Sequence, residues 1–238
     1  HRHAAYPVIV FAAFLKFYPL VLLVLTLREK RRRFVALDAA ALAMLVLFVA
    51  HYHAALVETW RVLPTRPTGD VLVGWGASLL PRGMTKLLTP ALSLDPETAR
   101  LARFLPDFLL LLLTANAVVR AVAMARRAAS RADFAALPPA PALFLIVGAS
   151  LIVGCFFAGE NIAYRGIFFL FLLPGLCALG RAGNAARWSG TAIAVLVLMW
   201  SDFLIDGIGA AIRTVDPARS FDVTVQAALW LALQLVWW

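Results

Sequence analysis

The residues best able to do chemistry are ionisable side chains that lie within long apolar runs. Lys16 is the clearest case, because aromatic and aliphatic residues flank it in an apolar run over residues 4–27. A charge at the centre of a membrane helix costs about 2.5–3.5 kcal/mol on insertion scales, so such a residue is usually functional. The alternative is that the Lys16 side chain extends to the membrane surface or pairs with a neighbouring helix. We favour a functional or buried-pair role, and we expect Pro19 to kink the same helix.

The densest group of polar residues stands at the start of another apolar run, within residues 159–170. The group consists of Glu160, Asn161, Tyr164 and Arg165. Arg165 follows Asn161 by four residues, so the two share one face if a helix begins early in this segment. A guanidinium group is a planar donor fork that suits phosphate or carboxylate, and a helix N-terminus also favours an anion. A structural ion pair between Arg165 and Glu160 or Asp202 is an equally open alternative.

The composition of the chain indicates that membrane helices position these residues. Of its 238 residues 63% are hydrophobic and 15% are charged, whereas a soluble protein is about half apolar and a quarter charged. The net charge of +9 does not indicate a nucleic-acid partner, because the basic residues lie between the apolar runs. Cys155 and Cys177 lie inside apolar runs, and His51 and His53 are too close in sequence to share a helical face. We therefore expect neither a metal site nor a cofactor.

Seven apolar runs are long enough, or nearly so, to cross a hydrocarbon core, which takes about 20 helical residues. They cover residues 4–27, 34–51, 104–125, 139–158, 164–179, 188–205 and 223–238. The predicted fold class is all-α, a polytopic transmembrane helical bundle that forms one domain over residues 1–238. Because a full-length run follows His1 almost at once, we expect the chain to be a fragment or a processed form of a longer protein.

The charges between the runs predict an orientation. Short basic loops at residues 28–33, 126–131 and 181–187 fall on one side if every run crosses once. Basic loops are typically cytoplasmic, so we expect an external N-terminus and a cytoplasmic C-terminus. The usage of Ala, Arg and Leu is typical of a GC-rich bacterial genome, which places the chain in the bacterial inner membrane.

One long external loop is expected over residues 52–103. Five prolines break it into short pieces. Residues 71–80 are apolar but too few to span a membrane, so they are expected to form a re-entrant or interfacial segment. Long loops on membrane proteins are more often functional than merely connecting.

The charges of several runs converge at the external face in this topology. Separate burial of these charges would be costly, whereas one hydrated cavity relieves that cost. We therefore expect Lys16 and Arg165 to adjoin a polar cavity that is open to the external leaflet. The other predicted lining residues are Tyr18, Asp107, Glu160, Asn161, Tyr164 and Asp202.

Two segments resemble a known family. Phe14–Leu20 resembles the Lys-x-x-Pro helix of polytopic GT-C glycosyltransferases, particularly glycosyltransferase family 87, and Gly159–Phe168 resembles a Tyr-Arg helix start in related bacterial sequences. The resemblance implies an enzyme that transfers a sugar from a polyprenyl-phosphate donor on the external face, with Lys16 and Arg165 at the donor phosphate. The essential acid of that family lies in the first external loop, near its N-terminus. If this chain lacks its N-terminal part, that acid is absent here, so the catalytic residue stays unassigned.

Two other classes of function remain open. A non-enzymatic membrane subunit of a larger complex is the main alternative, so other membrane subunits are open partners beside lipid and the polyprenyl-phosphate sugar. A transporter is less favoured, because the chain shows no internal repeat and no polar residues through the full membrane depth.

Overall fold

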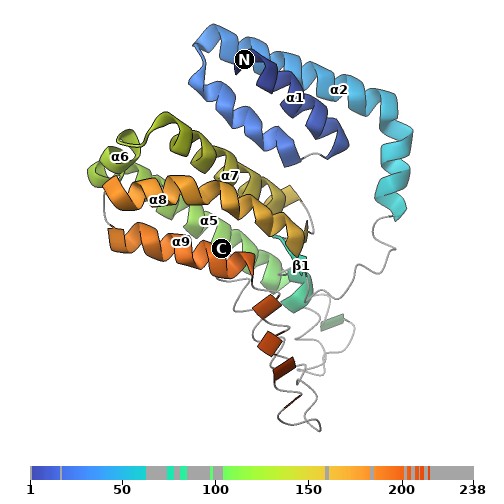
Figure 1. Cartoon of the computed structure of the whole chain (residues 1–238). Coiled ribbons are helices and arrows are strands. Elements are labelled where there is room, and N and C mark those ends of the chain that lie inside the picture. The colour runs from blue at the N-terminus through green and yellow to red at the C-terminus, as the bar shows by residue number, and fades with distance from the viewer. Residues whose placement is uncertain are drawn as a thin grey trace.

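The computed structural model of the chain is helical (Figure 1). It describes residues 2–16, 18–62, 74–77, 81–84, 97–98, 104–158, 161–182, 185–200, 203–204, 207–208, 210–211 and 214. Its helices are α1 (Arg2–Leu15), the 3-10 helix η1 (Tyr18–Arg28), α2 (Arg31–Val62), α5 (Phe104–Arg126), α6 (Ala128–Ala135), α7 (Pro139–Ala158), the 3-10 helix η3 (Ala163–Phe171), α8 (Leu172–Ala182) and α9 (Ala185–Met199). A two-residue strand β1 (Gly74–Trp75) pairs with β2 (Asn161–Ile162). The predicted all-helical class therefore holds, apart from this short ribbon.

Three helices of the described residues are long and apolar enough to cross a membrane. They cover Arg31–Thr59, Phe104–Arg126 and Pro139–Phe157. The other apolar helices, over Ala5–Leu15, Pro19–Arg28, Ile167–Ala182 and Ala185–Met199, are shorter. The prediction of seven spans is thus not confirmed, and the run over residues 223–238 lies outside the described part of the chain.

The first apolar run does not form one helix, so this prediction is wrong. α1 ends at Leu15 and η1 begins at Tyr18, with Lys16 between them. The Tyr6 hydroxyl donates a hydrogen bond of 3.1 Å to the Glu29 carboxylate. A straight helix would hold residues 23 positions apart about 35 Å from one another, so α1 and η1 must be the antiparallel arms of a hairpin.

Pro19 explains where the chain reverses. A proline disfavours the α conformation in the residue before it, and its missing N–H costs nothing in the first turn of a helix. Pro19 is the second residue of η1, so it starts a new helix instead of kinking a continuous one. The arms are about 21 Å and 22 Å long, which is less than the roughly 30 Å of a hydrocarbon core.

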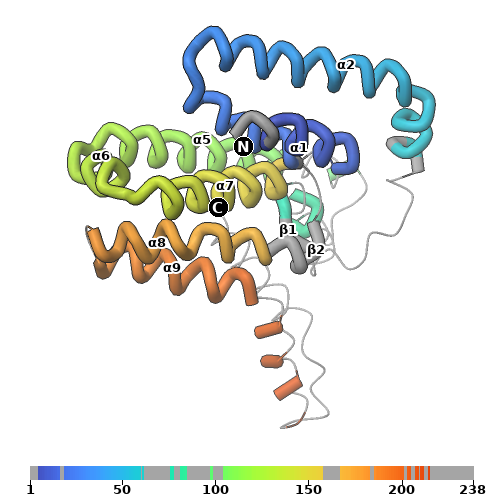
Figure 2. The backbone as a smooth tube through the Cα atoms, turned by 45° about the horizontal axis from the view of Figure 1, so that its top comes forward, coloured from blue at the N-terminus to red at the C-terminus, as the bar shows by residue number. Residues whose placement is uncertain are grey.

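Polar side chains help to hold the hairpin against α2. The buried Thr26 hydroxyl donates toward the Asp38 carboxylate at 3.1 Å and toward the Leu23 carbonyl at 2.6 Å. Phe14 of α1 stacks on Phe48 of α2, with ring centroids 4.7 Å apart. η1 also packs against α7, which joins this N-terminal unit to the rest of the protein (Figure 2).

A second unit consists of α7, η3, α8 and α9, around an apolar core. The core residues are Phe169, Leu172, Leu176, Leu179, Trp188, Val195 and Leu198. Two glycines allow α7 and α8 to approach closely, as small residues do between membrane helices. A Cβ on Gly175 would lie 2.5 Å from the Leu145 Cβ, and a Cβ on Gly148 would lie 2.9 Å from the Leu172 nitrogen.

Candidate functional site at one end of the bundle

The two ends of the second unit differ in chemistry. At one end, the Arg187 guanidinium lies 2.8 Å from the Met124 sulfur, and the Trp188 indole N–H donates to the Asp133 carboxylate at 3.3 Å. These contacts bring the end of α5, α6 and the start of α9 together. The described basic residues of these two loops, Arg126 and Arg187 among them, therefore lie at the same end of the molecule, as the predicted alternation of the runs requires.

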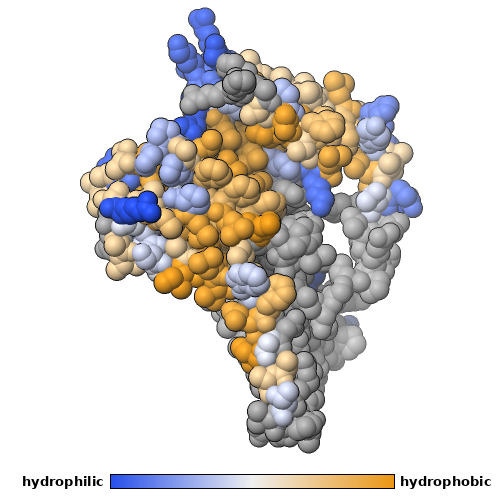
Figure 3. Space-filling model, in the orientation of Figure 1, coloured by the Kyte–Doolittle hydropathy of each residue, from blue (hydrophilic) through white to orange (hydrophobic). Residues whose placement is uncertain are grey.

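The first basic loop projects in the same direction. Figures 1 and 2 place the turn between η1 and α2 toward the end that carries α6. The side chains of this turn, Arg28, Lys30, Arg31, Arg32 and Arg33, are exposed. Figure 3 shows hydrophilic side chains projecting beyond the start of α2, while apolar side chains cover the visible face of α7 and α8.

At the other end of the second unit, several helix termini meet. α7 ends and η3 begins there, and the β1–β2 ribbon holds Gly74 opposite Ile162 and Trp75 opposite Asn161. The Ala77 amide donates to the Phe156 carbonyl at 2.7 Å. Leu110, from the first turns of α5, packs against the buried cluster of Ala77, Cys155 and Phe156. This end is the candidate functional site.

Residues 74–77 are the described part of the predicted re-entrant segment. They form a strand and a turn against the junction of α7 and η3, and Ala77 is buried beside Cys155 and Phe156. The other residues of that segment lie outside what the structure describes. Part of the long loop thus packs on the candidate site, as a functional loop would.

Lys16 lies in the turn between α1 and η1, not in the middle of a helix. Its amide donates to the Ala12 carbonyl at 3.0 Å, which closes the last turn of α1, and its side chain is exposed. Figures 1 and 2 show this turn toward the end of the molecule that carries β1. Lys16 is therefore directed to the predicted end of the bundle, although for a different structural reason. That it adjoins a polar cavity stays a prediction.

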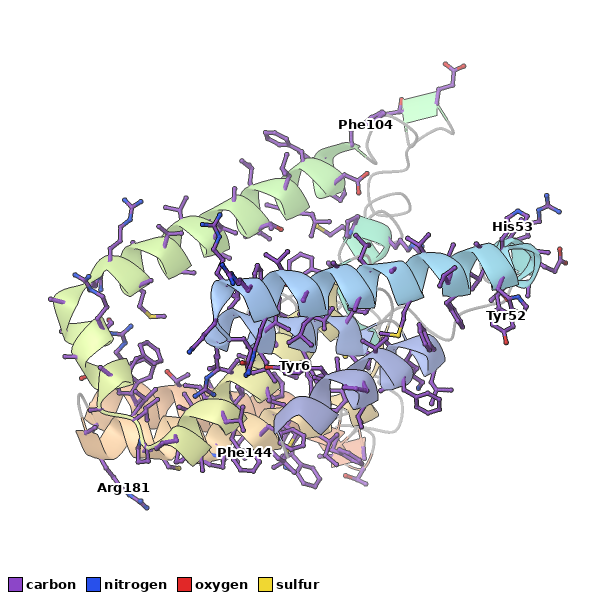
Figure 4. The ribbon with its side chains drawn as sticks, turned by 90° about the horizontal axis from the view of Figure 1, so that it is seen from above. Tyr6, Tyr52, His53, Phe104, Phe144 and Arg181 are labelled. Carbon is purple, nitrogen blue, oxygen red and sulfur yellow. The ribbon has the colours of Figure 1, made fainter. Side chains whose placement is uncertain are left out.

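Asp107 lies in the first turn of α5 and its side chain is exposed. A carboxylate there is stabilised by the helix dipole, so its position has a structural explanation as well as a functional one. Figure 4 shows Phe104, at the start of α5, and His53, in the C-terminal part of α2, away from Arg181 at the opposite end. Asp107 is thus at the predicted end.

The helix at the Tyr-Arg segment differs from the prediction. Asn161 belongs to β2, and η3 begins only at Ala163, so Asn161 and Arg165 do not share a helical face. This expectation is wrong because the ribbon pairing of Asn161 delays the start of the helix. Tyr164 and Arg165 do lie in the first turn of η3, at the candidate site.

Six of the predicted side chains lie outside what the structure describes. Glu160 and Asp202 lie outside the described residues, and only the backbones of Tyr18, Asn161, Tyr164 and Arg165 are described. The elements that carry Lys16, Asp107 and Arg165 thus share one end of the molecule. Whether their side chains line one cavity stays a prediction. Among the described residues, no group of three or more His, Cys, Asp or Glu side chains forms a metal site.

One polar pair lies inside α5, a helix of membrane length, and is not among the predicted cavity residues. Arg120 lies within α5, six residues before its basic end at Arg126, and its Nε donates to the Asn116 side-chain oxygen at 3.3 Å. Its place inside an apolar run of membrane length is the sequence signal that identifies it.

Comparisons with protein-family models, with curated proteins and with solved structures gave no match.

Proposed function

We propose that this chain is the membrane part of a GT-C type glycosyltransferase of the bacterial inner membrane. It would take a sugar from a polyprenyl-phosphate donor on the external face. The observation that supports this proposal is the position of Lys16, which is exposed in the turn of a hairpin that points toward the end where η3 begins.

The length of the hairpin sets the depth of Lys16. Its base carries the basic turn after η1, which the positive-inside pattern places in the cytoplasm. Arms of about 21 Å then bring the turn to about 9 Å below the external surface of the hydrocarbon core. A lysine stem extends toward the headgroups from this depth, so the Lys16 ammonium group would meet a lipid phosphate from below.

The hairpin changes the side of the membrane on which we expect the N-terminus. The Tyr6–Glu29 hydrogen bond places the start of α1 beside the basic turn. A hairpin of this kind would put the N-terminus on the same side of the membrane as the basic turn, not on the external side. We place both in the cytoplasm, and the cytoplasmic C-terminus stays a prediction.

The chemistry of the donor site follows from the residue types. Lys16 would supply a point charge, and Arg165 a planar fork for two phosphate oxygens. The N-terminus of η3 would add backbone donors and the positive end of its dipole. The cavity that holds the donor would include Tyr18, Asp107, Glu160, Asn161, Tyr164 and Asp202.

Donor binding by the full chain in lipid nanodiscs tests this proposal. The probe is a fluorescent polyprenyl-phosphate sugar. Charge-assisted hydrogen bonds contribute about 1.5–3 kcal/mol each, so Lys16→Ala and Arg165→Ala should each weaken binding about tenfold or more. Lys30→Ala is the matched control, because Lys30 is exposed in the basic turn, and it should bind as wild type. If Lys16→Ala and Arg165→Ala also bind as wild type, the donor site is wrong.

A second candidate function is a non-enzymatic subunit of a larger membrane complex. The observation that favours it is the exposure of α5, because none of the residues in its most apolar stretch is buried. A helix left open in this way suits a protein that is covered by partners. Sugar transfer from the donor by the purified chain and any upstream segment would exclude this alternative, whereas donor binding at wild-type affinity by both variants would favour it.

A further inference from the structure

α5 is the membrane-length helix that the rest of the described protein covers least. None of the residues in the most apolar stretch of α5 is buried, whereas 22% of those in the most apolar stretch of α7 are buried. Leu110 near one end and Met124 near the other are its contacts with the buried cluster at β1 and with Arg187 of α9. Large apolar side chains such as Leu112 and Val119 are exposed between these points.

This open helix carries a polar pair between its midpoint and its basic end. Asn116 is one residue beyond the midpoint of α5, and both Asn116 and Arg120 are exposed. Arg120 lies about 9 Å along the helix axis from Arg126. The hydrogen bond from Arg120 Nε to Asn116 draws the side chain toward the centre of the membrane and away from the basic end. Arg120 is therefore not extended toward the nearer headgroups.

The guanidinium group has unused hydrogen-bonding capacity. Its Nε is bound to Asn116, while its two terminal nitrogens carry four further N–H donors. In the part of the chain that the structure describes, no carboxylate pairs with Arg120. An unpaired guanidinium group in lipid carries a free-energy cost, and a carboxylate that pairs with it lowers that cost. The charge of this face therefore favours an acidic partner.

We propose that the face of α5 with Asn116 and Arg120 is the docking site for a transmembrane helix of another membrane protein. That helix carries a Glu or Asp near the middle of the bilayer. Both terminal nitrogens of Arg120 donate hydrogen bonds to its carboxylate, and its apolar residues pack on the exposed side chains of α5. This site is independent of the proposed donor site.

A second copy of this chain fits the face poorly. A two-fold contact would place the same surface on both sides and bring two Arg120 guanidinium groups together. Like charges repel strongly in a medium of low dielectric constant. The positive charge of this face therefore selects an acidic partner over self-association.

A synthetic helix of Leu and Ala with one central Glu is the probe for this site. The full chain is placed in lipid vesicles and labelled at Cys177, which is exposed, and energy transfer to an acceptor on the peptide measures association. The Glu peptide should bind at least tenfold more tightly than a peptide with Leu at that place. Arg120→Leu should reduce the preference to less than twofold, and Arg120→Lys should retain part of it, because lysine keeps the charge but loses the fork.

Two controls separate the docking site from general effects. Arg126→Leu, at the end of the same helix, should leave the preference unchanged. Asn116, Arg120 and Ala123 lie on one stripe of α5, whereas Val118 lies on the opposite side. In a Cys177→Ser background, Ala123→Cys should therefore cross-link to a cysteine in the Glu peptide, and Val118→Cys should not.

Three results would overturn the proposal. The first is equal binding of the Glu and Leu peptides by the wild-type chain. The second is a Glu preference that survives in Arg120→Leu. The third is strong energy transfer between two copies of the chain that Arg120→Leu abolishes, because the occupant would then be a second copy. Arg120→Leu should fold like the wild type, because leucine suits an apolar helix better than a charged residue does. A circular dichroism spectrum that matches that of the wild type checks this. None of these measurements uses the sugar donor, so failure here leaves the donor site open.

Discussion

The hairpin unit of α1, η1 and α2 and the bundle of α7, η3, α8 and α9 are both built from apolar runs, but they are held together differently. The hairpin unit uses side-chain hydrogen bonds between helices, from Tyr6 to Glu29 and from Thr26 to Asp38. The bundle relies on close apolar contact, which Gly148 and Gly175 permit. Polar bonds fix which residues face each other, whereas close packing fixes how near two helices lie.

The largest effect is expected where the bundle is tightest. A Cβ on Gly175 would lie 2.5 Å from the Leu145 Cβ and 2.9 Å from the Pro141 carbonyl oxygen. Gly175→Ala should therefore lower the free energy of unfolding by about 1–3 kcal/mol, because α7 and α8 must separate. Unfolding in mixed detergent, followed by circular dichroism, measures the change.

Gly190 provides the matched control for this substitution. A Cβ on Gly190 meets nothing within 4 Å. Gly190→Ala in α9 should raise the free energy of unfolding by about 0.5–1 kcal/mol, because alanine favours the helix. A bundle that tolerates both substitutions equally would not be held by close packing at Gly175.

A smaller effect is expected at the buried hydroxyl of the hairpin unit. Thr26→Val keeps the shape of the side chain but removes its donor to Asp38 and Leu23. The free energy of unfolding should fall by about 1 kcal/mol, because a partly buried carboxylate loses a hydrogen bond. Thr191→Val, at an exposed site of α9, should change stability by less than about 0.5 kcal/mol. Equal effects at the two threonines would contradict the role of polar bonds in the hairpin unit.

The smallest effect is expected at the base of the hairpin. Tyr6→Phe removes the hydroxyl that bonds to Glu29 and keeps the ring. The loss should be about 0.5–1 kcal/mol, because the bond is partly exposed. Tyr52→Phe on the exposed surface of α2 is the control. A loss from Tyr6→Phe no larger than from Tyr52→Phe would show that this bond does not hold the arms together.

Much of the helical architecture is predictable from the sequence, because apolar runs of membrane length have few alternatives to a helix. α5 and α7 match the runs over residues 104–125 and 139–158 within one residue at each end. α2 begins three residues before and ends eleven residues after its predicted run, because scattered polar residues such as His53, Glu58 and Arg61 interrupt the hydropathy of its last turns but not the helix. α6 lies in a predicted basic loop, where Asp133 bonds to Trp188 through a tertiary contact.

The positions of the prolines indicate where helices begin, which hydropathy alone does not show. Pro106, Pro139 and Pro174 lie in the first turns of α5, α7 and α8, where a proline is tolerated. By the same reasoning Pro19 marks the start of η1, and the run over residues 4–27 contains two helices. This reading also relocates Lys16 from the middle of a helix to a turn.

The candidate site is less predictable than the fold. The sequence predicts that α5 and η3 begin at the same end of the molecule, because successive apolar runs alternate in direction and the basic loops mark the other end. The pairing of Asn161 with Trp75 depends on a long-range contact that no local pattern reveals. Arg120 was detectable, because a guanidinium inside an apolar run is costly wherever the helix packs.

The hairpin is the central claim, and the sidedness of three cysteines tests it most directly. Ala5→Cys near the start of α1, Lys30→Cys beside Glu29 and Glu58→Cys near the end of α2 are all at exposed positions. Each is made in a Cys177→Ser background and labelled in sealed vesicles with a membrane-impermeant maleimide. The hairpin predicts that positions 5 and 30 are labelled from one side and position 58 from the other. Labelling of positions 5 and 30 from opposite sides would contradict it, because the first run would then cross the membrane as one helix.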